Sequence, residues 1–214
     1  MTRKAVPGLS EGVAMKKKVV IASNNAHKVD EIRTALDFEG WEYLTLKEAG
    51  LDSSPEEDAD TFEGNAWIKA QAAHEATGLA VLADDSGLVV DALAGRPGVL
   101  SARYAGGHGC DDANNAKLLG EMEPVPDDKR TARFVCSLVF IDEDGTEVTA
   151  EGRIEGHIAH GLRGEEGFGY DPLFLPLEFG GAKTLAEVPQ DEKNAISHRG
   201  NALRALKGKI SARP

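Results

Sequence analysis

Cysteine is scarce in this chain, and long apolar runs are absent from it. Its 214 residues contain two cysteines, Cys110 and Cys136, too few for a disulfide framework or a cysteine-ligated zinc cluster. No apolar stretch approaches the ~20 residues of a membrane span, and the first residues lack the apolar core of a signal peptide. We therefore expect a cytoplasmic protein with no membrane partner.

Positive charge is also in short supply. The formal net charge is −12, which argues against a general duplex-binding surface and against a nucleic-acid partner. The charges are unevenly spread, because residues 48–63 hold seven acids and no base, whereas residues 193–214 hold six Lys or Arg and no acid. An acidic loop and a basic terminal helix explain most of these charges, but an enzyme acting on a metal–phosphate substrate needs both surfaces around one cleft.

Periodicity predicts an α/β protein with a mixed sheet. Met15 stands directly before KKKVVIAS, so we expect residues 1–14 to be a disordered extension and residues 15–214 to form one domain. Apolar β-branched runs predict strands, and an Asp-Gly turn predicts a hairpin over 133–158. The expected strands are 18–22, 41–46, 79–83, 133–141 and 146–158. The expected helices run from Asn24 or Asn25 towards Gly40, from an Asp60–Glu63 capping box to Thr77, over 111–122, and over 190–206.

The first feature with possible chemistry is SNNAHK, residues 23–28, where a strand gives way to a helix. The free amides and positive dipole of a helix N-terminus bind anions, and Lys28 adds a cation in the same turn. No G-x-x-x-x-G-K-[ST] is present, so this is not a P-loop. The simpler interpretation is a capped helix with an exposed lysine.

The second feature is ADDSG, residues 83–87, where an apolar strand runs into two acids. A buried strand has little reason to end in adjacent like charges unless a cation or hydrogen-bond donors receive them. Since neighbouring strand residues point to opposite faces, we expect only one of Asp84 and Asp85 to face a site. A polar turn is the alternative.

Two later segments could bind a flat ligand. In GFGYDPLF, Phe168 and Tyr170 flank a glycine, although the segment also suits an aromatic turn packed on the core. In KNAISHRGNAL, His198 and Arg199 offer directional donors near the start of a helix, although such residues commonly lie on a solvated helix face. Lys69, by its spacing alone, is a surface lysine, and Cys136 is a buried hydrophobe.

Together these stretches carry a resemblance. SNNAHK, SSPEEDADTFEGNA, ADDSGLVVDALAGRPGVLSARYAG, GFGYDPLF and EKNAISHRGNAL occur in this order over residues 17–206, and the chain resembles the inosine triphosphate pyrophosphatase family. The resemblance implies an elongated, twisted mixed sheet flanked by helices, with two lobes around a central cleft. It also implies a homodimer that hydrolyses ITP, dITP and XTP to the monophosphate and pyrophosphate with Mg²⁺.

The resemblance also assigns site residues. Asp85 would be the catalytic base and a metal ligand, and Glu57, beside Glu56 and Asp58, would be the second magnesium carboxylate. The substrate contacts would be Ser23, Asn24, Asn25, Ala26, His27, Lys28, Lys69, Ser86, Phe168, Gly169, Tyr170, Asp171, Lys193, His198 and Arg199. The first motif departs from the usual T-G-N. Asn24 in place of the glycine is tolerable if the backbone there is left-handed, because Asn adopts that conformation more easily than most residues.

Two other functions fit less well. One is a pyrophosphatase for modified pyrimidine triphosphates, which a substrate panel distinguishes. The other is a non-catalytic nucleotide-binding protein, which Asp85 beside a full set of phosphate ligands disfavours.

In the favoured function, a deaminated purine nucleoside triphosphate is selected at its base. His198 and Arg199 donate to the oxygen at the purine 6-position, and donors of this kind disfavour the amino group of adenine.

Overall fold

The computed structural model describes residues 16–36, 38–107 and 110–213; the extension expected at 1–14 lies outside these ranges. Its centre is a six-stranded sheet in the order β2-β1-β3-β4-β5-β6. The strands are β1 (Lys17–Ile21), β2 (Trp41–Thr45), β3 (Ala80–Val90), β4 (Thr131–Ile141), β5 (Glu147–Ile158) and β6 (Phe174–Pro176). β1 runs parallel to β2 and β3, whereas β3 to β6 pair antiparallel, which confirms the predicted mixed sheet.

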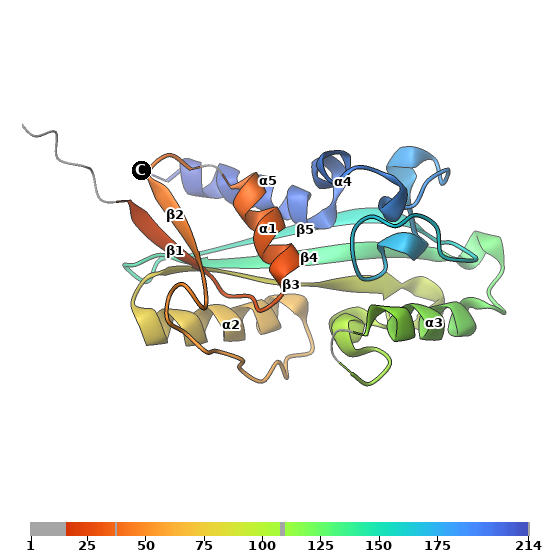
Figure 1. Cartoon of the computed structure of the whole chain (residues 1–214), viewed down its shortest axis with the longest axis horizontal. Helices are drawn as coiled ribbons and strands as arrows, with labels where there is room; N and C mark the ends of the chain where they lie inside the picture. Colours follow the sequence, from red (N-terminus) through yellow and green to blue (C-terminus); the bar gives the residue numbers. More distant parts are fainter. Residues whose placement is uncertain (1–15, 37, 108–109, 214) are drawn as a thin grey trace, which may run out of the picture.

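Helices cover both faces of the sheet (Figure 1). α2 and α3 lie along one side, and α1, α4 and α5 lie along the other. The helices are α1 (Ala26–Ala35), α2 (Phe62–Thr77), α3 (Asp111–Met122), α4 (Gln190–Ile196) and α5 (His198–Ser211). Short 3₁₀ helices connect these elements: η1 (Asp91–Leu93), η2 (Gly98–Arg103), η3 (Asp127–Lys129), η4 (Asp171–Leu173), η5 (Leu177–Phe179) and η6 (Leu185–Glu187).

Strand alternation builds a separate core on each face. In β1, Val19 and Ile21 pack with α1 and α5, whereas Val20 faces the alanine-rich side of α2. A third cluster surrounds the far ends of β3, β4 and β5 and includes Leu118 of α3 and Leu185. The three long strands, β3, β4 and β5, contribute residues both to this third cluster and to the clusters under α1, α2 and α5. This gives the expected two-lobed arrangement. No helix in the described part of the chain combines the length and apolar composition that a bilayer crossing requires.

The predicted strand end at Asp84 and Asp85 is wrong. β3 continues through both aspartates to Val90, because β4 pairs with it from Val81 opposite Ile141 as far as Val90. The two acids therefore lie in the middle of an eleven-residue strand.

Three helix boundaries also differ from the prediction. The helix expected over 190–206 is two helices, because Ser197 is extended (φ −62°, ψ 155°) and its side chain caps α5 by accepting from Gly200 N. The residue that caps α2 is Thr61, whose hydroxyl accepts from Gly64 N at 3.0 Å, so the Asp60–Glu63 capping box is wrong. Gly40 does not end α1 but occupies a left-handed turn before β2.

Candidate active site

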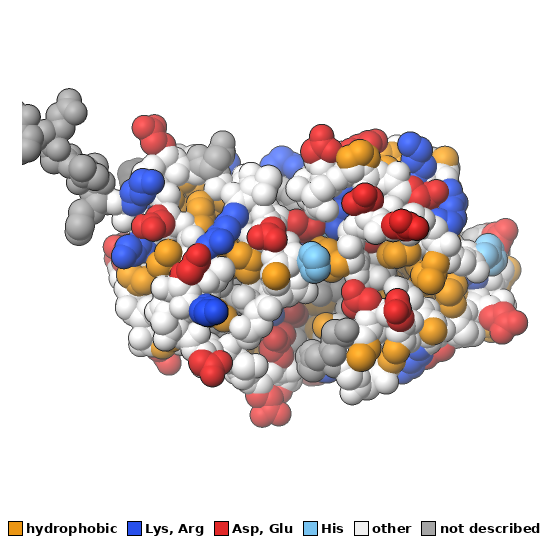
Figure 2. Space-filling view, in the orientation of Figure 1, with side chains coloured by type: hydrophobic (Ala, Val, Ile, Leu, Met, Phe, Trp, Pro, Cys, Tyr) orange, Lys and Arg blue, Asp and Glu red, His pale blue; other side chains and the backbone are white. Residues whose placement is uncertain are grey.

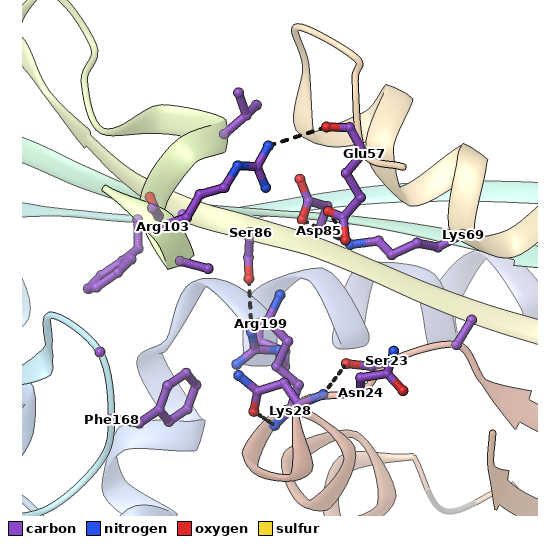
Figure 3. A pocket seen from close by; sticks show the side chains of 18 of the residues that line it. Ser23, Asn24, Lys28, Glu57, Lys69, Asp85, Ser86, Arg103, Phe168 and Arg199 are labelled. Carbon is purple, nitrogen blue, oxygen red and sulfur yellow. Dashed lines mark hydrogen bonds and ion pairs between the residues drawn. The ribbon is translucent and has the colours of Figure 1, made fainter. Parts of the chain in front are cut away.

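A pocket of about 530 Å³ lies where these elements meet, a volume typical of small-ligand sites. Lys28 of α1, Asp85 of β3 and Arg199 of α5 all line it, so three stretches far apart in sequence share one cavity (Figure 3). The other predicted residues that line it are Ser23, Asn24, Asn25, Glu57, Lys69, Ser86, Phe168, Gly169, Tyr170, Asp171, Lys193 and His198. Ala26 and His27 are not among its lining residues.

The turn before α1 is built as an N-cap. Asn25 is the cap, and its side chain accepts from Lys28 N at 3.2 Å. The amides of Ala26 and His27 find no partner in the described part of the chain, as is usual for the first turn of a helix. The backbone at Asn24 is not left-handed, since Ala94 is the non-glycine residue with positive φ among those described. Its side chain instead donates to Ser53 O at 3.0 Å.

Asp84 is buried behind the pocket on the side of α1 and α5. Its carboxylate contacts Lys28 Nζ at 2.5 Å and Arg199 Nε at 3.0 Å, and accepts from Cys136 Sγ at 2.9 Å. Burial alone would raise the pKa of Asp84, but the charges of Arg199 and Lys28 outweigh burial and hold that pKa well below its usual range. Asp84 therefore holds the two cations in place.

Asp85 points to the opposite face and lines the pocket, as strand alternation predicted. Its Oδ1 lies 3.0 Å from Lys69 Nζ, and Asn65 Nδ2 lies 3.4 Å from its Oδ2. Burial raises the pKa of Asp85, although Lys69 opposes the shift. A carboxylate with a raised pKa is a better proton acceptor than an exposed one.

Glu57 faces Asp85 across a lysine. Lys69 Nζ is 3.1 Å from Glu57 Oε2 and 3.0 Å from Asp85 Oδ1, so a cation already lies between these carboxylates. Burial alone would lower the pKa of Lys69, but the negative charges of Asp85 and Glu57 outweigh burial, so that pKa is raised above its usual value. The described residues contain no cluster of three or more metal-ligating side chains. Two carboxylates nevertheless suit Mg²⁺, which is usually held by one or two carboxylates together with substrate phosphates.

At the other end of the pocket, Phe168 presents its ring (Figure 3). It stacks on His27 with centroids 5.2 Å apart and planes 11° apart, and Lys193 Nζ lies 4.5 Å from its centroid. Two α3 residues hold the neighbouring Gly169: its N–H donates to Asp111 at 2.8 Å and its carbonyl accepts from Asn115 at 2.9 Å. α3 thus fixes the loop that carries the aromatic ring.

The C-terminal cations are buried rather than solvated. Lys193 is 2% exposed and contacts Glu31 at 3.0 Å and Asp171 at 2.8 Å. Arg199 is 1% exposed, contacts Glu31 and Asp84, and donates to Ser86 Oγ at 3.0 Å. The alternative of a solvated helix face is therefore wrong for both residues.

His198 has a polar atom without a partner. It is 5% exposed, and its ring stacks on Phe134 with centroids 4.8 Å apart. Its Nδ1 is buried and makes no hydrogen bond within the described ranges. Burial lowers the pKa of His198 well below its usual value, and Arg199 lowers it further, so the imidazole is neutral near pH 7. A neutral imidazole offers one donor and one acceptor to a ligand.

Sequence reasoning missed Glu31, Arg103 and Asp111. Glu31 lies three residues after Lys28 in α1 and therefore on the same helix face. This spacing could have identified Glu31 from the sequence. Asp111 and Asn115 are four residues apart in α3, which also places them on one face. Arg103 lines the pocket from a turn-rich segment in which nothing singled it out.

Comparisons with known proteins show the family to which the chain belongs. The Ham1 family model matches residues 19–209. The chain is 50% identical over 200 residues to a dITP/XTP pyrophosphatase of Clostridium perfringens, with 91% of this chain and 97% of the relative covered. It is similar to the Staphylococcus aureus Ham1 protein, at a TM-score of 0.82 and 40% identity over 91% of this chain and 98% of that one. A Mycobacterium abscessus dITP/XTP pyrophosphatase gives a TM-score of 0.73 and 46% identity, covering 88% and 98%. The chain belongs to the Ham1 family.

Proposed function

We propose that this protein hydrolyses the deaminated purine nucleoside triphosphates dITP, ITP and XTP to the nucleoside monophosphate and pyrophosphate. The observation that carries the proposal is the convergence of Lys28, Asp85 and His198 on one pocket. Relatives that share about half of its residues are dITP/XTP pyrophosphatases by name. The protein thereby removes these nucleotides from the nucleotide pool.

The two ends of the pocket suit the two ends of such a substrate. The phosphates lie against the first turn of α1, with its unpartnered amides, and against Lys28 and Lys69, which stabilise charge on the leaving group. Asp85 accepts a proton from the attacking water. Mg²⁺, when held by Asp85 and Glu57, neutralises charge on phosphate oxygens.

The base lies against the Phe168 ring and beside His198. Arg199 retains N–H groups besides those donated to its buried partners, and the neutral His198 ring supplies a further donor or acceptor. An oxygen at the purine 6-position satisfies such donors, whereas the amino group of adenine leaves them unpaired. Sites of this kind discriminate by about 10⁴-fold or more.

The decisive experiment is a substrate panel with and without Mg²⁺. We expect wild-type protein to release pyrophosphate from ITP, dITP and XTP but not from ATP. We expect Asp85→Asn to lower kcat by about 10² to 10⁴, the usual contribution of a general base. Asp58→Asn, an exposed carboxylate next to Glu57, is the matched control and should keep wild-type activity.

The other outcomes point elsewhere. Activity on modified UTP or CTP with none on ITP would favour a pyrimidine pyrophosphatase. Binding of ITP without pyrophosphate release would favour a non-catalytic nucleotide-binding protein.

We also propose that the protein is a cytoplasmic homodimer, as the family resemblance implies. Light scattering on the purified protein tests its oligomeric state.

A further inference from the structure

Arg103 differs from the other cations of the pocket. Lys28, Lys69, Lys193 and Arg199 all make ion pairs with carboxylates. Arg103 also lines the pocket, but its one hydrogen bond in the described part of the chain runs from Nη2 to the backbone carbonyl of Glu57, at 3.3 Å. Arg103 therefore makes no ion pair with a carboxylate among the residues that the structure describes.

The Arg103 guanidinium lies at the end of the pocket that contains Glu57 and Asp85, the two carboxylates proposed to hold Mg²⁺. Figure 3 shows Arg103 pointing towards Glu57 and Asp85, away from Phe168. Glu57, Asp85 and Lys69 together leave this end with a net negative formal charge, which would repel a chain of phosphates. Arg103 cancels that charge, and four of its five N–H groups remain free to donate.

The backbone that carries Arg103 is firmly placed. η2 packs directly on β3, since a Cβ added at Gly87 would lie 2.4 Å from Ser101 Oγ and 2.6 Å from Gly98 O. Ser101 Oγ accepts from Leu88 N at 2.9 Å, and its carbonyl accepts from Tyr170 Oη at 2.9 Å. These contacts fix the end of η2 relative to Asp85, which lies two residues before Gly87.

We propose that Arg103 binds the terminal phosphates of the substrate and holds the pyrophosphate leaving group. The guanidinium fork matches phosphate oxygens in a bidentate manner, and it stabilises charge as the anhydride bond breaks. This inference rests on the proposed function, because it assigns the part of the same substrate that Arg103 contacts. The competing role is structural: through the Glu57 carbonyl, Arg103 could serve only to anchor the acidic loop.

Calorimetry with pyrophosphate and Mg²⁺ separates the two roles without using turnover. We expect Arg103→Gln to weaken pyrophosphate binding by about 10- to 100-fold, as for loss of a charged hydrogen bond. IMP binding should change less than about twofold, and Arg103→Lys should restore part of the lost affinity. Arg96→Gln, from the same turn-rich segment but outside the pocket and paired with Glu121, should bind pyrophosphate as wild type does.

Equal weakening of pyrophosphate and IMP binding, or unchanged pyrophosphate binding, would overturn the proposal. So would a change confined to the Mg²⁺ concentration needed for half-maximal activity, which is the mark of an anchoring role. Thermal unfolding of each variant confirms that it folds. If wild-type protein binds pyrophosphate through Arg103 but releases none from ITP, the proposed function fails, whereas Arg103 is still a pyrophosphate-binding residue.

Discussion

At the scale of the residue, orientation and burial decide what each ionisable group can do. Asp84 and Asp85 are neighbours in the chain, yet Asp84 is enclosed by two cations, whereas Asp85 faces the pocket and has a raised pKa. The same burial that raises the pKa of Asp85 also lowers that of His198. Asp85 is therefore suited to accept a proton, whereas His198 is suited to form neutral hydrogen bonds.

We predict that His198 stays neutral across the range in which an exposed histidine titrates. Burial and the adjacent Arg199 charge both disfavour the imidazolium. NMR of labelled protein should show no titration of the His198 ring between about pH 6 and pH 8, although its unperturbed pKa would be near 6.5. In urea the same signal should titrate normally. A folded-state midpoint near 6.5 would contradict the burial that the structure shows.

Much of the site could be predicted from residue patterns, but the partners of its charges could not. The sequence pointed to Lys193 and Arg199 through a motif. It gave no sign that both contact Glu31, which lies 162 and 168 residues away along the chain. Ion pairs between distant segments leave no periodic signal, so the burial of these cations appeared only once the helices were placed in space.

At the scale of the element, the boundaries failed where tertiary contacts overrode local preference. DDSG has the composition of a turn, yet it stays extended because β4 pairs with β3 from Val81 to Val90 and cations receive its charges. The break at Ser197 was missed for a related reason. The apolar spacing continues across it, but Ser197 must cap α5 for His198 and Arg199 to start a helix facing the pocket.

The crossing of α5 over β5 depends on Gly152. A Cβ there would lie 2.2 Å from Ala202 N and 2.3 Å from His198 O, both backbone atoms that cannot rotate away. We predict that Gly152→Ala destabilises the protein by about 1 to 3 kcal/mol, as overpacking does. It should also lower kcat/KM for ITP, because it displaces the start of α5. Urea unfolding and steady-state kinetics check both effects.

Gly208 provides the control in the same helix. A Cβ at this exposed position meets nothing within 4 Å. Gly208→Ala should therefore stabilise the protein by about 0.5 to 1 kcal/mol, as expected for a helix interior. Wild-type stability and activity in Gly152→Ala would mean that β5 and α5 do not approach as closely as the structure shows.

At the scale of the whole molecule, a buried ionic network joins α1 to β3 and to the two last helices, α4 and α5. Glu31 of α1 contacts Lys193 of α4 and Arg199 of α5, and Arg199 in turn contacts Asp84 of β3. The visible surface, by contrast, intersperses acidic and basic side chains (Figure 2). Exposed pairs contribute little to stability, whereas breaking a buried one leaves an uncompensated charge. The network therefore couples the stability of the fold to the geometry of the pocket.

This coupling makes acid stability a test of the network. Burial alone would raise the pKa of Glu31, but Arg199 and Lys193 outweigh it and lower that pKa below the usual 4.5. A depressed carboxyl pKa stabilises the fold above the unfolded value, and this contribution is lost as pH falls through the folded value. We predict that Glu31→Gln costs about 3 kcal/mol or more near pH 7, and that its deficit against wild type shrinks below about pH 4.5.

Urea unfolding at a series of pH values measures that deficit. Glu192→Gln, an exposed carboxylate on α4, should stay within about 0.5 kcal/mol of wild type throughout. A Glu31→Gln deficit that stayed constant as the pH fell below 4.5 would mean that Glu31 is not ionised against these cations in the folded protein. The same variant should lose activity before it unfolds, because Lys193 and Arg199 line the pocket that Glu31 holds in shape.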